Sequence, residues 1–225
     1  SGTLLRMSLR FVIVGGGPAG TQAATHAARL GAEVTLIERD VVGGAANLRD
    51  CIPSKAMIAT GGAFGDFHLA SGMGLVAEPP TLDLAALRQR VASIEHQLEV
   101  ATTRLLESQG VRLVRGTGRL LDAHTVVAGT EEGDEVFEAD AIMLSTGSRP
   151  RIPDWAVPDG ERVLTTRDAY PPAELPEHLV VIGSGVTGVE FVHMFSSFGS
   201  KVTLIVSRQQ VLPSKDPEVA AVLEE

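Results

Sequence analysis

The chain has 225 residues, of which 44% are hydrophobic, and its formal net charge is −9. This length and composition are those of a globular protein of one or two domains, and no apolar run reaches the roughly 20 residues that a membrane-spanning helix requires. The acidic balance, and an aromatic content of only 4%, argue against binding of nucleic acids or acidic membranes.

The first part of the chain predicts a strand, a glycine turn, a helix and a second strand. The strand Arg10–Val14 precedes the turn Gly15-Gly16-Gly17-Pro18-Ala19-Gly20, an Ala-rich helix runs to Leu30, and Ala32–Glu38 is the second strand. This order is a βαβ unit.

The spacing Gly15-x-Gly17-x-x-Gly20 is typical of a dinucleotide site. The first glycine permits the tight turn, the second lets a pyrophosphate approach the backbone, and the third lets helix and strand pack closely. Glu38 ends the second strand, where a carboxylate can accept hydrogen bonds from ribose hydroxyls. A plain tight turn is the alternative.

The longest helical pattern is Asp83–Gln109, with Asp83 as the N-cap and Gly110 as the stop. Its apolar residues recur at steps of three and four and form one stripe, which either packs on a sheet or meets a coiled-coil partner. The stripe consists of Leu84, Leu87, Val91, Ile94, Leu98, Ala101 and Leu105.

Short strands are expected next. Val111–Arg115, Thr125–Ala128 and Glu135–Glu138 predict a β-meander. Ala141–Leu144 is a buried strand that runs into the turn Ser145-Thr146-Gly147, and the proline-rich segment Arg149–Pro158 predicts a linker.

A second βαβ unit follows. The strand Leu179–Ile182, the turn Gly183-Ser184-Gly185-Val186-Thr187-Gly188, a helix to about Phe198 and the strand Lys201–Val206 repeat the first plan. No acid ends this strand. Ser207 and Arg208 follow it instead, and a hydroxyl and a guanidinium suit a 2′-phosphate, which favours NADPH over NADH. A solvated surface arginine is the alternative for Arg208.

Asp216-Pro217 predicts the start of a further helix, within which the sequence stops. A nucleotide-binding unit usually adds more strands after its first βαβ. We therefore expect the chain to be a fragment of a longer protein.

The segment Gly43-Gly44-Ala45-Ala46-Asn47-Leu48-Arg49-Asp50-Cys51-Ile52-Pro53-Ser54-Lys55 resembles the redox-active segment of the pyridine nucleotide-disulfide oxidoreductases, the flavoprotein disulfide reductases. Disulfide-using members of that family have two cysteines separated by four residues, and here Ala46 stands at the first position. Cys51 is the only cysteine of the chain, so the chain cannot form a dithiol relay internally. The segment specifically resembles a lipoamide-dehydrogenase-like quinone reductase branch known from actinobacteria, which also lacks the first cysteine.

The resemblance implies an α/β fold with two Rossmann-like βαβ units and a small β-meander. Residues 1–148 would form an FAD-binding domain, and residues 149–225 would open an incomplete NAD(P)-binding domain. Gly118 belongs to a weaker match, Gly116-Thr117-Gly118, for which a turn is the alternative. The implied FAD residues are Gly15, Gly17, Pro18, Ala19, Gly20, Glu38, Arg39, Gly43, Gly44, Lys55, Gly118, Ser145, Thr146 and Gly147, and the implied NAD(P) residues are Gly183, Gly185, Val186, Thr187, Gly188, Glu190, Ser207 and Arg208.

The implied catalytic residues are Lys55, Glu190 and Cys51. By resemblance, Lys55 lies near flavin N5 and forms an ion pair with Glu190, where a cation stabilises the reduced flavin. The alternative is an exposed lysine and a glutamate on a helix surface. Cys51 corresponds to the cysteine near the flavin, either as a thiolate that donates charge or as an inert buried thiol.

The expected function is that of an FAD-dependent NAD(P)H dehydrogenase that passes electrons to a diffusible acceptor, a quinone. The alternatives are a pyridine nucleotide transhydrogenase, a dihydrolipoamide dehydrogenase-like enzyme and a non-catalytic FAD-binding fragment. The lone cysteine fits the reducing cytoplasm, and the resemblance implies a homodimer at full length. The resemblance implies that the family's acid–base histidine and its glutamate would lie beyond Glu225. The six histidines have no metal-ligand spacing.

Overall fold

The computed structural model describes residues 8–76, 78, 80–207 and 210–224. They pack as two compact units, which are described separately here. The first unit comprises the residues up to Ile52 together with Ala92–Val163, and the second comprises Pro53–Val91 together with the residues from Leu164 on. These units are defined by which residues pack together. The predicted division at residue 148 is defined by the cofactor that each part would bind, and it stays a prediction.

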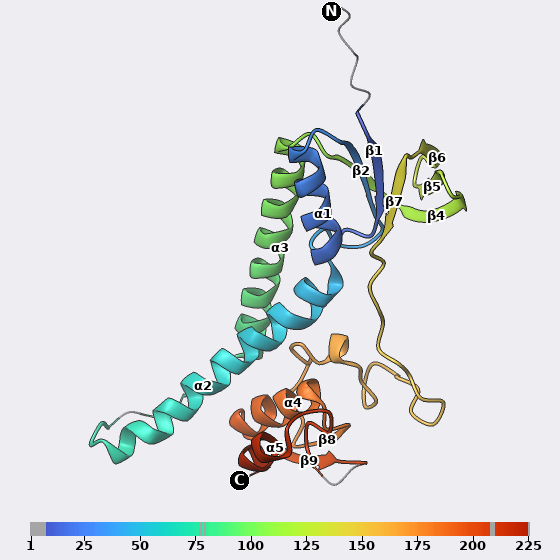
Figure 1. The fold of residues 1–225 in the computed structure, drawn as a ribbon. Helices are drawn as coiled ribbons and strands as arrows, with labels where there is room; N and C mark the ends of the chain where they lie inside the picture. Colours follow the sequence, from blue (N-terminus) through green and yellow to red (C-terminus); the bar gives the residue numbers. More distant parts are fainter. Residues whose placement is uncertain (1–7, 77, 79, 208–209, 225) are drawn as a thin grey trace, which may run out of the picture. The chain divides into compact units, whose positions relative to one another are not determined.

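The first unit is built on a parallel sheet in the order β3-β2-β1-β7. Its α1 (Pro18–Arg29) and the second half of α3 (Leu84–Ser108) lie on one side of the sheet, and a β-meander lies on the other (Figure 1). The sheet strands are β1 (Arg10–Val14), β2 (Glu33–Glu38), β3 (Arg112–Arg115) and β7 (Ala141–Leu144).

Alternating side chains of β1 build the cores on both sides of this sheet. Ile13 is fully buried in a cluster with Ala24 of α1 and Leu106 of α3, while Val12 and Val14 are buried in a cluster with Phe137 of the meander. Successive residues of a strand point to opposite faces. Both faces of this sheet are therefore covered, as is usual for a parallel sheet.

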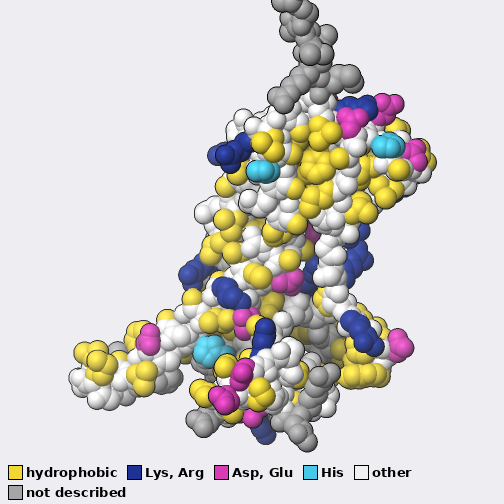
Figure 2. Space-filling view, viewed as in Figure 1, with side chains coloured by type: hydrophobic (Ala, Val, Ile, Leu, Met, Phe, Trp, Pro, Cys, Tyr) yellow, Lys and Arg dark blue, Asp and Glu magenta, His cyan; other side chains and the backbone are white. Residues whose placement is uncertain are grey.

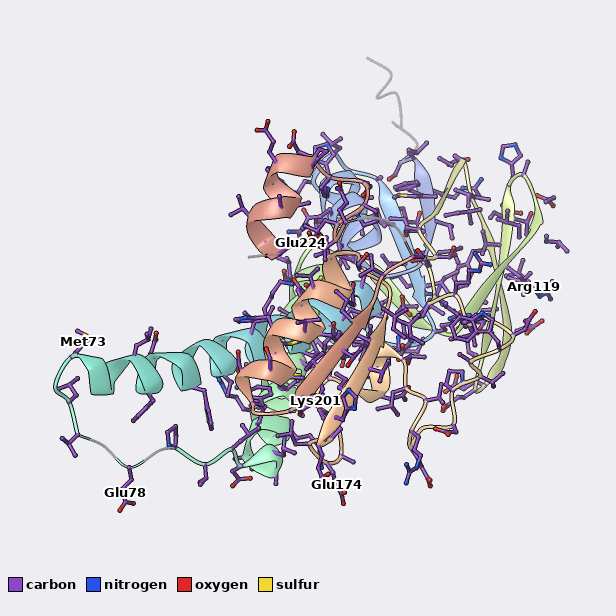
Figure 3. The ribbon with its side chains drawn as sticks, turned by 90° about the horizontal axis from the view of Figure 1, so that it is seen from below. Met73, Glu78, Arg119, Glu174, Lys201 and Glu224 are labelled. Carbon is purple, nitrogen blue, oxygen red and sulfur yellow. The ribbon has the colours of Figure 1, made fainter. Side chains whose placement is uncertain are left out.

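The meander corrects one sequence prediction. It consists of β4 (Thr117–Asp122), β5 (Thr125–Thr130) and β6 (Gly133–Glu138), in antiparallel order; Figure 3 labels Arg119 on β4. Val111–Arg115 was predicted as its first strand, but β3 instead pairs in parallel with β2. The strand that was missed, β4, is exposed at nearly every position, so it lacks the apolar alternation that marks a half-buried strand.

The helix α3 has the predicted caps but not the whole predicted stripe. The Ala86 N–H donates to Asp83 Oδ1 at 2.9 Å, and Gly110 has a φ of +75°. Leu105, which ends the stripe, is 49% exposed, and Leu106 is fully buried in its place. A stripe with a period near 3.5 residues drifts by about 20° per heptad around a straight helix, so its last member turns away from the core.

The second unit is organised around a cluster of aromatic and aliphatic side chains on α4 (Val186–Ser197). Phe191 and Phe195 stack with centroids 5.6 Å apart. Met57 of α2 (Ile52–Gly72) belongs to the same cluster. The remaining elements are the parallel pair β8 (His178–Ile182) and β9 (Lys201–Ile205), the turn η2 (Thr166–Asp168) and α5 (Pro217–Glu224).

Among the described residues of the second unit, side chains cover only one face of the sheet. Leu179, Val181 and Val202 pack against the cluster, whereas Val180, Ile182 and Ile205 are 49%, 58% and 50% exposed. The far end of α2 and the turn after it also carry exposed hydrophobic side chains (Figure 2), among them Met73, which is labelled in Figure 3. Among the helices of the described residues, none is long and apolar enough to cross a membrane.

Candidate functional site

The first glycine turn has the geometry of a nucleotide-binding loop. Gly15 has a φ of +107°, which a residue with a side chain rarely adopts. A Cβ on Gly20 would lie 1.9 Å from the Gly15 carbonyl oxygen, so only glycine lets α1 pack this closely on the turn. Gly17 is the N-cap of α1, Pro18 follows at the first helical position, and no side chain caps this end. The N–H groups of the first turn, including that of Ala19, are thus available to a phosphate.

Gly43 and Gly44 form a wall of bare backbone beside this turn. The Gly43 N–H donates to the Gly16 carbonyl at 2.8 Å. A Cβ on Gly44 would lie 2.4 Å from the Gly17 Cα. The two glycine segments therefore approach each other without side chains between them, and this backbone cradle suits the pyrophosphate of a dinucleotide.

Glu38 braces the turn at the end of β2. Its Oε2 accepts from the Gly16 N–H at 2.6 Å, and its Oε1 accepts from the Asp40 N–H at 2.7 Å. A carboxylate has about four lone-pair sites, so both oxygens can also accept from the hydroxyls of a ribose. Arg39, which lies between Glu38 and Asp40 in the sequence, is exposed.

The turn after β7 lies against the first glycine turn. The Ser145 N–H donates to the Val14 carbonyl at 2.8 Å, and its Oγ donates to the Gly15 carbonyl at 2.7 Å. Ser145 thereby brings Thr146 and Gly147 to the end of β1. Gly118 lies in β4 opposite Ala128, which overturns the alternative that it belongs to a turn.

The segment that carries the family resemblance forms a π-helical turn, η1 (Ala46–Cys51), which continues into α2. The Ile52 N–H donates to the Asn47 carbonyl, five residues back. Such turns occur mostly as single insertions in helices, often at functional sites. Cys51 is exposed in this structure, and both interpretations of it at a flavin, a thiolate or an inert buried thiol, stay predictions.

An ion pair that was not predicted supports this turn. Arg49 Nη1 lies 3.2 Å from Glu95 Oε2 of α3, and the Glu95 side chain is only 16% exposed. Burial raises the pKa of Glu95 above its ordinary value, more than the Arg49 guanidinium lowers it.

Lys55 and Glu190 form an ion pair within the second unit. Lys55 Nζ of α2 lies 2.5 Å from Glu190 Oε1 of α4, with side chains 58% and 21% exposed. The same ammonium donates to Ser54 Oγ at 3.3 Å, and Ser54 is buried. The structure thus contains the pair that the resemblance implies, and the pair's role at a flavin stays a prediction.

The second glycine turn repeats the first. The Gly183 N–H donates to the Ile205 carbonyl at 3.0 Å, and a Cβ on Gly188 would lie 1.9 Å from the Gly183 carbonyl oxygen. Gly185 is the N-cap of α4, again without a side-chain cap, so the N–H groups around Val186 and Thr187 are available to a phosphate. Ser207 follows β9, and Arg208 lies outside the described residues.

Two further features of the first unit were not predicted. A cavity of about 190 Å³ is lined by Pro18, Thr21, Gln22, Thr25, Gly43, Asn47, Thr102, Leu105 and Leu106. Arg115 of β3 contacts Glu99 of α3 and the turn after Glu38. Neither follows a sequence motif, because each joins residues from separate elements. Among the described residues, no group of His, Cys, Asp and Glu side chains could hold a metal ion.

Comparison with known proteins agrees with this architecture. The family model described as pyridine nucleotide-disulphide oxidoreductase matches residues 9–225. An NAD(P)H dehydrogenase (quinone) of Mycobacterium tuberculosis is 41% identical over 97% of this chain and 47% of its own length. Dihydrolipoyl dehydrogenase 2 of Haloarcula marismortui is 35% identical over 95% of this chain and 46% of its own length. The chain therefore spans about half the length of these curated relatives.

Solved structures give the same result. The crystal structure of LpdA from Mycobacterium tuberculosis matches with a TM-score of 0.88 and 39% identity, covering 96% of this chain and 48% of LpdA. The HOCl-induced flavoprotein disulfide reductase RclA from Escherichia coli matches with a TM-score of 0.79 and 25% identity, covering 96% of this chain and 46% of RclA. The matched family model and these relatives show that the chain belongs to the pyridine nucleotide-disulphide oxidoreductase family.

Proposed function

We propose that the protein containing this chain is an FAD-dependent NAD(P)H dehydrogenase that passes electrons to a diffusible small molecule, a quinone, without a redox disulfide. One observation carries the proposal. The chain keeps both glycine turns and the Lys55–Glu190 pair, yet Cys51 is its only cysteine. The name of the Mycobacterium tuberculosis relative, an NAD(P)H dehydrogenase (quinone), supports the same reaction.

In this proposal the first glycine turn binds the FAD pyrophosphate and Glu38 binds its adenosine ribose. Gly43, Gly44 and the turn at Ser145 complete the cradle. When bound, FAD supplies the chemistry of hydride acceptance from the pyridine nucleotide and of electron transfer onward. The Lys55 ammonium, oriented by Glu190, provides fixed positive charge where negative charge develops.

The pyridine nucleotide binds at the second glycine turn. We propose NADPH as the preferred form, because β9 ends without an acid and Ser207 and Arg208 follow it. NADH is the alternative. The homodimer and the cytoplasmic location stay predictions.

Anaerobic titration of the full-length protein with NADPH tests the absence of a disulfide relay. Uptake of about two electrons per flavin is expected, since a dithiol couple would add two more. Uptake of about four electrons would overturn the proposal and favour dihydrolipoamide dehydrogenase chemistry. Turnover with an NAD analogue in place of a quinone would favour a transhydrogenase, and a flavin that NADPH fails to bleach would favour a non-catalytic FAD-binding protein.

Lys55→Met tests the role of the ion pair. The methionine keeps the length of the side chain and removes its charge, so flavin reduction by NADPH should slow by tenfold or more, since removal of one preorganised donor at a developing charge costs about 10²–10³-fold in known cases. Stopped-flow absorbance measures this rate. Lys201→Met, at the exposed start of β9, is the matched control and should leave the rate unchanged; an unaltered rate in Lys55→Met would remove the role assigned to Lys55.

A further inference from the structure

Arg115 and Glu99 lie beside the proposed FAD site of the first unit, and no sequence motif includes them. Arg115 ends β3 and is the register partner of Glu38 on β2, and the next N–H, that of Gly116, donates to the Glu38 carbonyl at 2.9 Å. Opposite charges at partnered strand positions attract each other. The Arg115 guanidinium is therefore placed where it could pair with the Glu38 carboxylate.

The guanidinium is held elsewhere. Its Nη2 donates to Glu99 Oε1 of α3 at 2.9 Å, and its Nη1 donates to the Asp40 carbonyl at 3.0 Å. The Glu99 side chain is 27% exposed, so the pair is partly shielded from water. A fork of fixed donors suits this double contact, which a lysine ammonium makes less well.

These contacts form a chain that ends at the glycine turn. Glu99 orients Arg115, Arg115 binds the Asp40 carbonyl, the Asp40 N–H donates to Glu38, and Glu38 accepts from the Gly16 N–H. The carboxylate of Glu38 thus faces backbone donors and keeps acceptor capacity for a ribose. Pairing with the guanidinium would take that capacity away.

We infer that Arg115 is a positioning residue for the adenosine ribose of FAD, and that Glu99 orients it and keeps it away from Glu38. The inference rests on the proposed function, because it assumes that the first unit binds FAD. It adds a positioning pair, Arg115 and Glu99, to the glycine turn and Glu38.

Titration of the full-length apoprotein with FAD, followed by quenching of flavin fluorescence, tests the inference. Arg115→Ala should raise the Kd three- to tenfold, which corresponds to about one hydrogen bond. Glu38→Gln should also raise it. In the double variant the effect of Arg115→Ala should disappear, since Arg115 acts through Glu38; a merely structural role would give effects that multiply.

Two further variants complete the experiment. Arg115→Lys should recover part of the affinity, because its ammonium can keep one of the two contacts. Arg112→Ala is the matched control on the same strand; Arg112 pairs with Glu135 at 2.6 Å, and the Kd should stay at the wild-type value. If the wild-type protein binds FAD and Arg115→Ala binds it equally well, or if the two effects multiply, the inference is wrong. If the wild-type protein does not bind FAD, the proposed function itself fails.

Discussion

Arg10, the first residue of β1, binds Asp140, the residue immediately before β7. The Arg10 N–H donates to Asp140 Oδ2 at 2.8 Å, and Arg10 Nη2 donates to Oδ1 at 2.9 Å. Hydrogen bonds from the Arg10 side chain and backbone lower the pKa of Asp140 from 3.8 to about 2. Asp140 therefore contributes stability above pH 3.8, and this contribution is lost as the pH falls through about 2.

Asp140→Asn should remove this pH dependence. The variant should be less stable than the wild type at pH 6, and the difference should shrink as the pH falls from 4 towards 2, because both chains are then uncharged at residue 140. Urea midpoints across this pH range measure the effect. Asp134→Asn is the control, since Asp134 pairs with Arg119 through side chains that are 60% and 58% exposed and such pairs contribute little. An equal difference at all pH values would contradict the assignment.

At the scale of elements, the π-helical turn η1 keeps the frame of a dithiol centre but only the second of its two sulfurs, that of Cys51. In a π-turn the N–H bonds to the carbonyl five residues back, so residues five positions apart lie near one another on one side of the turn. Ala46 and Cys51 are five positions apart and are the first and last residues of η1. An α-helical turn would place them on different sides.

Ala46→Cys should therefore form a disulfide with Cys51 under mild oxidation. The expected observations are the loss of both free thiols and a mass lower by two hydrogens than that of the reduced chain. Ala45→Cys, six positions from Cys51, is the matched control and should keep its thiols under the same conditions. Two free thiols in oxidised Ala46→Cys would show that the turn does not bring these positions within disulfide distance.

The glycine turns could be predicted from the sequence because their constraint is local. Gly15 and Gly183 take positive φ values, and the strand and helix on either side carry ordinary periodic patterns. The caps of α3 were predicted for the same reason. The Lys55–Glu190 pair came only from the family resemblance, since no local pattern joins α2 to α4.

The helix α2 could not be predicted in this way. It carries Gly61, Gly62 and Gly65, and its apolar residues are spread around the helix instead of along one face, so neither propensity nor periodicity indicates a helix. Tertiary packing stabilises it: a Cβ on Gly61 would lie 3.0 Å from the Ser197 Cβ. The contacts of Arg49 with Glu95, and of Arg115 with Glu99, depend on the same long-range arrangement.

At the scale of the whole molecule, the chain passes between the two packing units more than once. The cluster of the second unit joins Met57 and Val91 to Phe191 and Phe195. A cut at the predicted boundary after Ser148 would separate these residues, although it would leave both βαβ motifs intact.

A piece comprising residues 1–148 should therefore expose apolar side chains that are buried in the longer chain. Met57 and Leu87 are 0% and 5% exposed, and full burial of such a side chain contributes about 1.5–3 kcal/mol. The piece should bind a hydrophobic dye strongly and precipitate at concentrations that residues 1–225 tolerate. A cooperatively folded piece without dye binding would instead support residue 148 as a domain boundary.

The exposed face of the sheet in the second unit affects how molecules of this chain associate with one another. Val180, Ile182 and Ile205 present a contiguous apolar surface on a parallel pair of strands, and such surfaces attract one another. The net charge of −9 opposes this attraction only over the Debye length, about 10 Å at 0.1 M salt. Added salt shortens the range of the repulsion while the apolar attraction persists, so we expect ionic strength to set the concentration at which molecules of this chain begin to associate.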